Sequence, residues 1–259
     1  MPDFIRVDVQ DRLAIVTINR PEVRNALNSD VVRELTAAFE RLARDPQVGA
    51  IILTGAGDKA FVAGADIKEM VGKSGLEMQA FSEMGRRLGD AMERCPKPIL
   101  AAINGYALGG GCEIAMACDL RLASENAKIG QAEINIGIIP GFGGSQRLPR
   151  LVGSGWAAQM VFTGEAIDAA TAERIGLVNR VVPADRLLEE ARSLARKMLE
   201  KSPVALSLAK ACLRAAQEMP LPQGLSYEAA AFGVVGATQD KVEGMTAFLE
   251  KRKAVWKGA

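Results

Sequence analysis

The sequence predicts an α/β protein with a helical C-terminal region. Over the first half of the chain, apolar patterns typical of strands alternate with patterns typical of helices, which is the order that α/β folds require. From about residue 183 onwards only helical patterns remain. The chain has 259 residues, of which 49% are hydrophobic and 24% charged. This ordinary globular composition favours one sizeable core, either alone or with a smaller appended region.

The strands and helices of the first half follow from the spacing of apolar residues. Apolar residues alternate over 5–16 on both sides of Asp11 and Arg12, which predicts a strand hairpin. The next segment is capped by Asn28 or Ser29 and repeats its apolar residues every three or four positions, as a helix does. Continuous apolar runs indicate strands buried on both faces. The elements predicted after the hairpin are a helix over 30–44, a strand over 48–54, a glycine-rich loop over 55–65, a helix over 76–94, a strand over 98–103, a loop over 104–110, a helix over 111–117 and strands over 119–123 and 128–131.

The second half ends in amphipathic helices. The spacing predicts helices over 184–200, from Pro203 to Met219, over 225–237 and over 239–254. Amphipathic helices of this length bury little apolar surface unless they dock onto something else. We therefore divide the chain into a core over 1–200 and a C-terminal helical region over 201–259 that serves as an oligomerisation or lid region.

Charge and composition exclude several classes of function. Lys plus Arg total 32 and Asp plus Glu total 31, a balance that does not favour binding to nucleic acid. Histidine is absent, so Ser-His-Asp triads, Cys-His dyads and histidine-containing zinc sites are excluded. Acid–base chemistry near neutral pH must therefore use carboxylates, Lys, Tyr or Cys.

The cysteine pattern and the hydropathy favour a cytoplasmic protein without a membrane span. The four cysteines form no CxxC pair and are too sparse for a disulfide scaffold, which is typical of a reducing compartment. The first residues carry an early Asp3 and no apolar stretch of signal-peptide type. No uncharged apolar run reaches about 18 residues, the length that a membrane span needs.

Two glycine-containing segments follow the strand predicted over 48–54. Residues 55–60 match the dinucleotide-binding pattern GxGxxA, but no helix opens directly after the glycines, as that site requires. In residues 63–70, small residues precede Asp66. This segment is either a tight turn capped by the aspartate or a turn that directs a free backbone N–H, such as that of Ala65, into a pocket.

A third glycine-rich segment leads into the short helix predicted over 111–117. Its glycines allow close packing of a buried helix, or let Gly110 or Gly111 offer an unpaired N–H to a ligand. Glu113 lies in the first turn among apolar residues. A carboxylate there can simply complement the helix terminus, but burial would also raise its pKa into the range that suits acid–base catalysis.

Glu133 is a second isolated acid next to glycine-rich backbone. Alone it is most simply an exposed loop carboxylate. Together with Glu113, it predicts a site with paired carboxylates. The glycine-rich segment 140–148 lacks the Lys-Ser/Thr ending of a phosphate-binding P-loop, so we interpret it as a glycine-permitted turn into a helix.

Taken together, these motifs resemble the crotonase (enoyl-CoA hydratase) family over most of the chain. The matching segments occur in the family's order and are Asn19-Arg20-Pro21, Asn25-Ala26-Leu27, Ala63 to Met70, Asn104 to Asp119, Gln131 to Leu148, Glu243-Gly244-Met245 and Phe248 to Arg252. The resemblance implies a spiral of ββα units with a C-terminal helical region. It also implies self-association as a trimer, commonly paired into a hexamer.

The resemblance assigns roles to four residues. Ala65 and Gly110 match the backbone N–H donors of the family's oxyanion hole, which would bind the thioester carbonyl oxygen as it gains negative charge. Glu113 and Glu133 match the family's two catalytic glutamates. We expect Glu113 to activate water for attack at C3 and Glu133 to protonate C2 of a trans-2-enoyl thioester, giving the (S)-3-hydroxyacyl-CoA.

The resemblance also implies a binding site for coenzyme A, which enters as part of the substrate. No metal and no other cofactor is expected. The positions that match coenzyme A contacts are Val23, Arg24, Ala26, Ala63, Asp66, Ile67, Lys68, Phe248 and Lys251. The last two would reach the ligand of a neighbouring subunit, although Lys251 could equally lie on a solvated helix face.

Two alternatives stay open at the level of the sequence. A Δ3,Δ2-enoyl-CoA isomerase would use the same scaffold with one acid–base group and no activated water. A non-catalytic or RNA-binding relative would be expected to lack a glutamate or to carry a basic surface, and neither feature is present.

Overall fold

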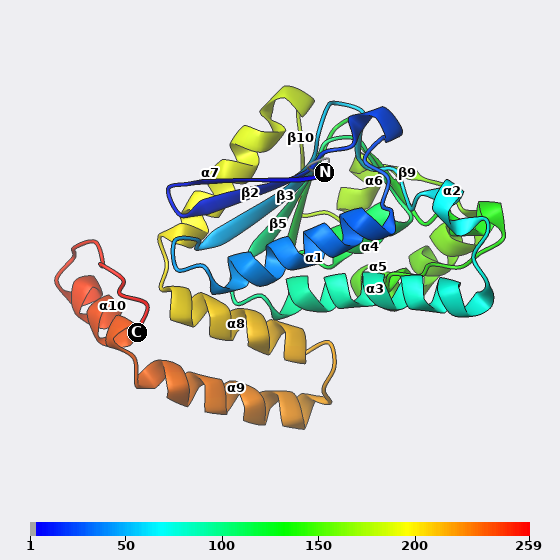
Figure 1. Ribbon diagram of the computed structural model, residues 1–259. Helices are drawn as coiled ribbons and strands as arrows, with labels where there is room; N and C mark the ends of the chain where they lie inside the picture. The colour runs from blue at the N-terminus through cyan, green and yellow to red at the C-terminus, as the bar shows by residue number, and fades with distance from the viewer. Residues whose placement is uncertain (1–3) are drawn as a thin grey trace.

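The computed structural model describes residues 4–259 and confirms the α/β class (Figure 1). Its larger sheet has six strands, of which the first pair is antiparallel and the rest are parallel. In spatial order they are β1 (Ile5–Gln10), β2 (Leu13–Ile18), β3 (Ala50–Gly55), β5 (Ile99–Ile103), β7 (Leu120–Ser124) and β10 (Arg180–Val182). The hairpin predicted over residues 5–16 is therefore confirmed as β1 and β2.

The strands that lie between these along the chain form a second, smaller sheet. It consists of β4 (Ala60–Val62), β6 (Tyr106–Leu108), β8 (Lys128–Gly130) and β9 (Ile167–Asp168), in that order. Strands β4, β6 and β8 are parallel to one another, and β9 is antiparallel to β8. From β3 to β8 the chain thus alternates between the two sheets, and a helix follows each pair of strands. This is the ββα spiral that the family resemblance implies.

Helices cover both faces of the larger sheet. Figure 1 shows α1 (Ser29–Arg44) and α3 (Gly75–Arg94) side by side across one face and α7 (Leu187–Leu199) on the other. In β3, Ile51 and Leu53 join the core under α1 and α3, whereas Ala50 and Ile52 join the core under α7. A strand buried on both faces needs a continuous apolar run, which explains the unbroken pattern in its sequence.

The remaining helices position the site and form the C-terminal region. Asn28 accepts the N–H of Val31 as the predicted cap of α1. Figure 1 shows α8 and α9 antiparallel, with α9 and α10 standing away from the two sheets. The bounds are η1 (Pro21–Val23), α2 (Ile67–Met70), α4 (Gly110–Met116), η2 (Glu133–Ile136), α5 (Gly144–Thr163), α6 (Ala169–Arg174), η3 (Ala184–Arg186), α8 (Pro203–Ala215), α9 (Leu221–Gly236) and α10 (Gln239–Leu249).

A buried lysine attaches the C-terminal helices to the core. The Lys210 ammonium on α8 lies 2.8 Å from a carboxylate oxygen of Asp119. It also donates to the backbone carbonyls of Met92 at 3.2 Å and Lys97 at 3.0 Å. One cation thus binds the end of α3 and the start of the next strand, which fixes the direction in which α8 leaves the core.

Several element predictions needed correction. The segments 55–65 and 104–110 contain the three-residue strands β4 and β6 and are not loops throughout. Strands this short show no usable apolar period. Residues 55–60 connect two strands, so the dinucleotide pattern there opens no helix. The C-terminal helices α8 and α10 end earlier than expected and α9 begins earlier, whereas the division at residue 200 stays a prediction.

Two further sequence expectations concern membranes and cysteines. No helix within residues 4–259 is long and apolar enough to cross a membrane. Cys95, Cys112, Cys118 and Cys212 are all free thiols. Among the described residues, no group of three or more Cys, Asp or Glu side chains is arranged to hold a metal ion.

Candidate active site

The candidate site lies where the strands of the smaller sheet end. Ala65 follows β4, Gly110 follows β6 and Glu133 follows β8, each within three residues of the strand. Because these strands are parallel, their carboxyl ends meet at one edge of the sheet, the usual place for ligands in α/β proteins. All three residues line one cavity of about 270 Å³, together with Glu113. The structure therefore brings together the four residues to which the sequence assigned catalytic roles.

Ala65 and Gly110 bring two backbone segments close together at this cavity. A Cβ atom placed on Gly110 would lie only 3.9 Å from the backbone nitrogen of Ala65. Gly110 is the first residue of α4, where a helix leaves its N–H groups without intrahelical partners. Within residues 4–259, the hydrogen bonds of turns and loops include none donated by the N–H of Ala65 or Gly110. Both donors are thus free to bind an acceptor in the cavity.

Glu113 is buried and held by the glycine-rich loop before α5. It is 2% exposed, and its Oε1 accepts the N–H of Phe142 at 2.7 Å and that of Gly144 at 2.6 Å. Burial, followed by the negative charge of Glu133, raises the pKa of Glu113 to about 7, against the two backbone N–H donors and the charge of Arg147. A carboxyl group with this pKa exchanges its proton readily at neutral pH.

Glu133 lies at the start of η2 and is 9% exposed. The simple interpretation as an exposed loop carboxylate is therefore wrong. Burial raises its pKa as well. Its Oε2 is buried and has no hydrogen-bond partner in the described structure. A buried carboxylate oxygen without a partner is costly, and such groups cluster at functional sites.

The rest of the cavity wall is mostly apolar. The side chains around the two carboxylates come from α2, α3, β6 and the segment after η2, so the cavity suits an apolar chain next to an acid–base centre. The apolar lining residues are Ile67, Met70, Met78, Phe81, Leu108, Ile136, Ile138, Ile139 and Phe142.

The residues predicted to contact coenzyme A fall into two groups. Ala63 and Ile67 line the cavity. Arg24 lies next to it, because Ala63 donates its N–H to the carbonyl of Arg24 at 3.1 Å, and Val23 and Ala26 lie near Arg24 in the chain without lining the cavity.

Within the same group, Asp66 caps α2 by accepting the N–H of Lys68 at 3.2 Å. Asp66 also pairs with Arg20 at 3.4 Å. The aspartate cap and the free N–H of Ala65 are therefore both present, and the two sequence interpretations of this turn do not exclude each other.

Phe248 and Lys251 form the second group and do not line the cavity. Phe248 is near the end of α10 and 83% exposed. Lys251 follows α10, which Figure 1 shows far from α2. Their predicted contact with the ligand of a neighbouring subunit stays a prediction.

The sequence interpretation missed the loop that binds Glu113. Phe142, Gly143 and Gly144 were assigned only to a turn into a helix, and α5 does begin at Gly144. The turn also supplies the two N–H donors to Glu113. The run of glycines close to two isolated acids was the available signal, but only the tertiary structure shows which acid the loop faces.

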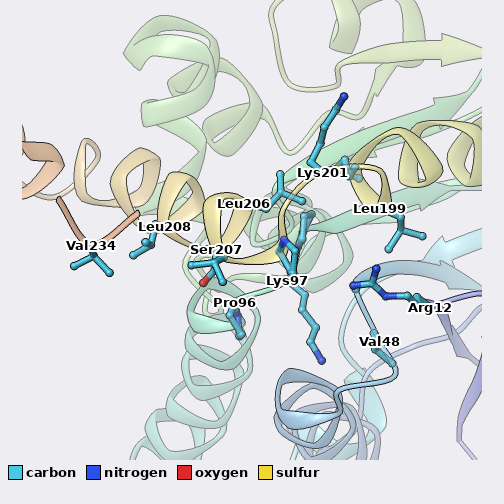
Figure 2. A pocket seen from close by; sticks show the side chains of 15 residues that line it. Arg12, Val48, Pro96, Lys97, Leu199, Lys201, Leu206, Ser207, Leu208 and Val234 are labelled. Atoms are coloured by element: carbon cyan, nitrogen blue, oxygen red, sulfur yellow. The ribbon is translucent and has the colours of Figure 1, made fainter. Parts of the chain in front are cut away.

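A larger cavity lies elsewhere, between α8 and the core (Figure 2). It measures about 370 Å³ and is lined mostly by apolar residues, together with Arg12, Lys97, Lys201 and Ser207. The Lys97 ammonium donates to the carbonyls of Leu42 and Asp45 at the end of α1, so this cation has a structural use. No Asp or Glu within residues 4–259 lines this cavity, so the smaller cavity is the better candidate for acid–base chemistry.

Comparison with known proteins agrees with this site. A model of the family "Enoyl-CoA hydratase/isomerase" matches residues 8–259. A crotonyl-CoA hydratase of Syntrophomonas wolfei is 49% identical over 96% of both chains. A short-chain-enoyl-CoA hydratase of Clostridium acetobutylicum is 47% identical over 95% of both chains.

Solved structures resemble the whole chain as well. The crystal structure of an enoyl-CoA hydratase from Bacillus anthracis superposes with a TM-score of 0.95 and 40% identity, covering 99% of this chain and 100% of that one. The paired carboxylates, the free N–H groups and these full-length similarities lead to one conclusion. The chain belongs to the enoyl-CoA hydratase/isomerase family.

Proposed function

We propose that this protein is an enoyl-CoA hydratase, which adds water reversibly and syn to a trans-2-enoyl-CoA and forms the (S)-3-hydroxyacyl-CoA. The observation that carries the proposal is the meeting of two buried carboxylates and two free backbone N–H groups at one apolar cavity. Hydratases of this family act on the same class of substrate by name.

In the proposed reaction, the N–H groups of Ala65 and Gly110 bind the thioester carbonyl oxygen. As water attacks C3, the C2=C3 electrons move towards this oxygen, so fixed donors stabilise the transition state more than the substrate. Oε1 of Glu113 already accepts two N–H groups, which leaves Oε2 to take the proton from the attacking water. Glu133 delivers its proton to C2. The product gains one hydroxyl group and one hydrogen, and a proton returning from Glu113 to Glu133 through solvent restores the enzyme.

Coenzyme A enters this reaction only as part of the substrate. The proposed steps are proton transfers between carboxylates, water and carbon, and they require neither electron transfer nor a Lewis acid. We place the nucleotide end of the substrate near Val23, Arg24 and Ala26, beside α2, because this segment borders the cavity through Ala63.

We further propose that the protein assembles as a trimer or as a hexamer made of two trimers, in the cytoplasm. In support, the C-terminal helices expose many large apolar side chains, and contiguous apolar surface usually marks a contact between proteins. These side chains are Leu213, Leu221, Leu225, Phe232, Val234, Val242, Met245, Phe248 and Leu249. The mass in solution, measured by light scattering, separates the two assemblies. A monomer would contradict both.

The function is tested with crotonyl-CoA and the purified protein. We expect loss of the enoyl absorbance and formation of (S)-3-hydroxybutyryl-CoA, identified by chiral chromatography. Incubating the protein with a 3-enoyl-CoA in parallel distinguishes a hydratase from an isomerase. Conversion of the 3-enoyl thioester to the 2-enoyl thioester without hydration of crotonyl-CoA would refute the proposal.

A further inference from the structure

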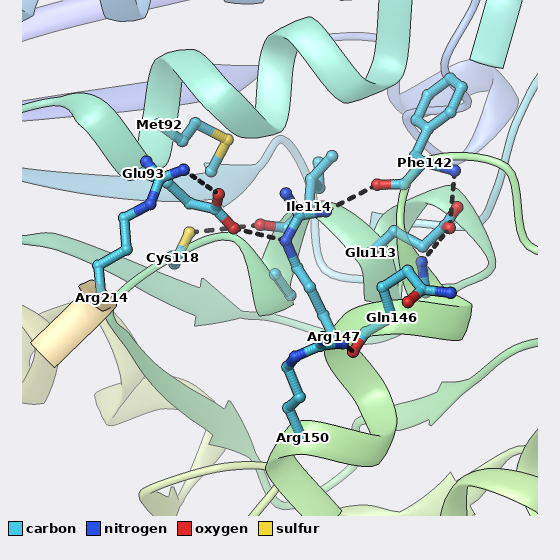
Figure 3. A network of polar contacts seen from close by, with 12 residues as sticks. Met92, Glu93, Glu113, Ile114, Cys118, Phe142, Gln146, Arg147, Arg150 and Arg214 are labelled. Atoms are coloured by element: carbon cyan, nitrogen blue, oxygen red, sulfur yellow. Dashed lines mark hydrogen bonds and ion pairs between the residues drawn. The ribbon is translucent and has the colours of Figure 1, made fainter. Parts of the chain in front are cut away.

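The loop that binds Glu113 is itself held from behind by an arginine. Phe142 donates its N–H to Glu113 at 2.7 Å, and its carbonyl accepts Nη1 of Arg147 at 2.8 Å. Figure 3 shows this arrangement, with Phe142 between the carboxylate and the guanidinium. A displacement of Arg147 would therefore also displace Phe142, whose N–H fixes the orientation of the Glu113 carboxylate.

Arg147 in turn is fixed by a carboxylate on α3. Its Nε lies 2.5 Å from Oε1 of Glu93, and both side chains are largely buried. The other oxygen of Glu93 faces Nη2 of Arg214 on α8 at 3.5 Å. Figure 3 shows Glu93 between the two arginines. A planar guanidinium that bonds in two directions is oriented more strictly than a lysine ammonium would be.

Two glycines of α3 make room for this arrangement. A Cβ on Gly85 would lie 2.0 Å from the Phe142 ring, and a Cβ on Gly89 would lie 2.5 Å from Nη2 of Arg147. Residues four apart share one face of a helix, so this face carries both the ring and the guanidinium. Glycine inside a helix lowers stability relative to alanine. In α3, the Phe142 ring and the Arg147 guanidinium occupy the space that Cβ atoms would fill.

We propose that Arg147 is a positioning residue for Glu113, which holds the Phe142 carbonyl so that the loop keeps its two N–H groups on the carboxylate, and that Glu93 orients Arg147. Arg147 is not among the described residues that line the cavity, so it acts on the substrate through Phe142 and Glu113 and not by direct contact. This inference deepens the proposed hydration and rests on it.

The charges around Glu113 give the expected direction of the pH effect. The charged groups that face it are Glu133 from η2 and Arg147 from α5, and from α3 Glu93 is already paired with Arg147. The short strands β4 and β6 place no acid or base in the described cavity wall. Loss of Arg147 removes a positive charge and loosens two N–H donors, and both changes raise the pKa of Glu113.

The test compares Arg147→Gln, Glu93→Gln and the double variant with a matched control, Arg150→Gln. Arg150 lies on the same helix, and within residues 4–259 its Nη1 donates only to the carbonyl of Gln146. We expect Arg147→Gln to lower kcat for crotonyl-CoA by about 10²-fold, the loss typical of a small misplacement of a catalytic group, with little change in KM. The acid limb of the rate profile should move to higher pH.

The double variant separates a positioning role from two independent contributions. Because Glu93 acts through Arg147, the double variant should be no slower than Arg147→Gln alone, and Arg150→Gln should match the wild type. Thermal unfolding of each variant shows whether the fold is kept, and Glu93→Gln, the mildest change, tests the idea even if Arg147→Gln unfolds. Wild-type kcat and an unmoved pH profile in both single variants, or losses that multiply in the double variant, would overturn the inference.

Failure of the proposed function would be recognised separately. If the wild type does not hydrate crotonyl-CoA, the function fails, but the pKa of Glu113 still tests the inference. It can be followed by NMR of protein labelled at the glutamate carboxyl carbons, with Glu113→Gln to assign the signal. A higher pKa in Arg147→Gln than in the wild type supports the inference, and an equal pKa refutes it.

Discussion

A Cβ atom on Gly109 would lie 2.9 Å from Oε1 of Glu133, so the Glu133 carboxylate packs directly against the peptide backbone before α4. Gly109 also adopts a positive φ of 50°, which glycine tolerates best. Glu133 is therefore placed by packing, whereas Glu113 is placed by two N–H donors. Pairs of carboxyl groups with different surroundings are typical of sites that need one acid and one base.

The first prediction concerns the proton donor. Glu133→Gln should lower hydration of crotonyl-CoA by about 10²- to 10⁴-fold, the contribution expected of a general acid or base. The shape of the side chain is kept, so the oligomer should persist in light scattering. Glu165→Gln serves as control, because Glu165 is exposed and outside the cavity. Activity near that of the wild type would reject the role of Glu133.

The second prediction concerns the pH dependence of the rate. As the base, Glu113 must be ionised, and its pKa is raised to about 7. The charge of Glu133 contributes to this value, and Glu133 is neutral in the proposed active form, so we expect kcat/KM to fall as the pH drops through a range above 4.5 and no higher than about 7. In the proposed mechanism Glu133 must be protonated, and because burial raises its pKa, we expect a second fall where Glu133 loses its proton. A flat profile across the neutral range would contradict the assignment of a base with this pKa.

The third prediction concerns stability. In the folded protein the pKa of Glu113 lies above its ordinary value of 4.5. Between pH 4.5 and about 7, the folded state keeps a proton that the unfolded chain has released. The free energy of unfolding therefore falls as the pH rises through this range.

Glu113→Gln cannot ionise and still accepts the two N–H groups. At pH 8 it should be more stable than the wild type, by on the order of 3 kcal/mol, and at pH 5 nearly equal. Thermal unfolding of both proteins across this range measures the difference. The prediction fails if the difference in stability between the two proteins does not increase with pH.

The fourth prediction concerns the backbone donors. Gly110→Ala adds a methyl group 3.9 Å from the nitrogen of Ala65, and its nearest side-chain contact would be Leu27 at 3.3 Å. The fold can adjust to this contact, but the methyl group narrows the gap between the two backbone segments. We expect kcat/KM to fall by about 10²-fold, as when an oxyanion donor is lost.

Gly155→Ala is the matched control, because no atom lies within 4 Å of a Cβ at that position. It should keep full activity. Equal activity of the two alanine variants would show that the thioester oxygen does not bind between Ala65 and Gly110.

The fifth prediction concerns the contact between subunits. If Phe248 and Lys251 reach coenzyme A of a neighbouring subunit, Phe248→Ala and Lys251→Gln should raise KM for crotonyl-CoA and leave kcat unchanged, since they affect only binding. An unchanged KM in both variants, with the oligomer intact by light scattering, would remove them from the binding site.

The sequence alone predicted those parts of the fold and site that depend on local patterns. The hairpin, the cap of α1 by Asn28 and the helical C-terminal region follow from residue spacing. The strands β4 and β6 are too short for a period, and β9, α6 and β10 were not predicted at all. Glu113 was found because an acid stands out in an apolar helix. The support from Phe142 and Arg147 depends on contacts 29 and 54 residues apart in sequence, which no local pattern reveals.

The parallel pairing of β4, β6 and β8 affects how the residues of the candidate site are aligned with one another. Ala65, Gly110 and Glu133 each lie two or three residues past the end of one of these strands, so their mutual spacing depends on strand pairing as well as on the short turns. A slip of β6 by one residue would carry Gly110 past Ala65 by about 3.3 Å and reverse the direction of each side chain of β6. The pairing of the strands in the smaller sheet thus helps to set the distances between the residues of the candidate site. Substitutions inside this sheet deserve the same scrutiny as substitutions of the acids themselves.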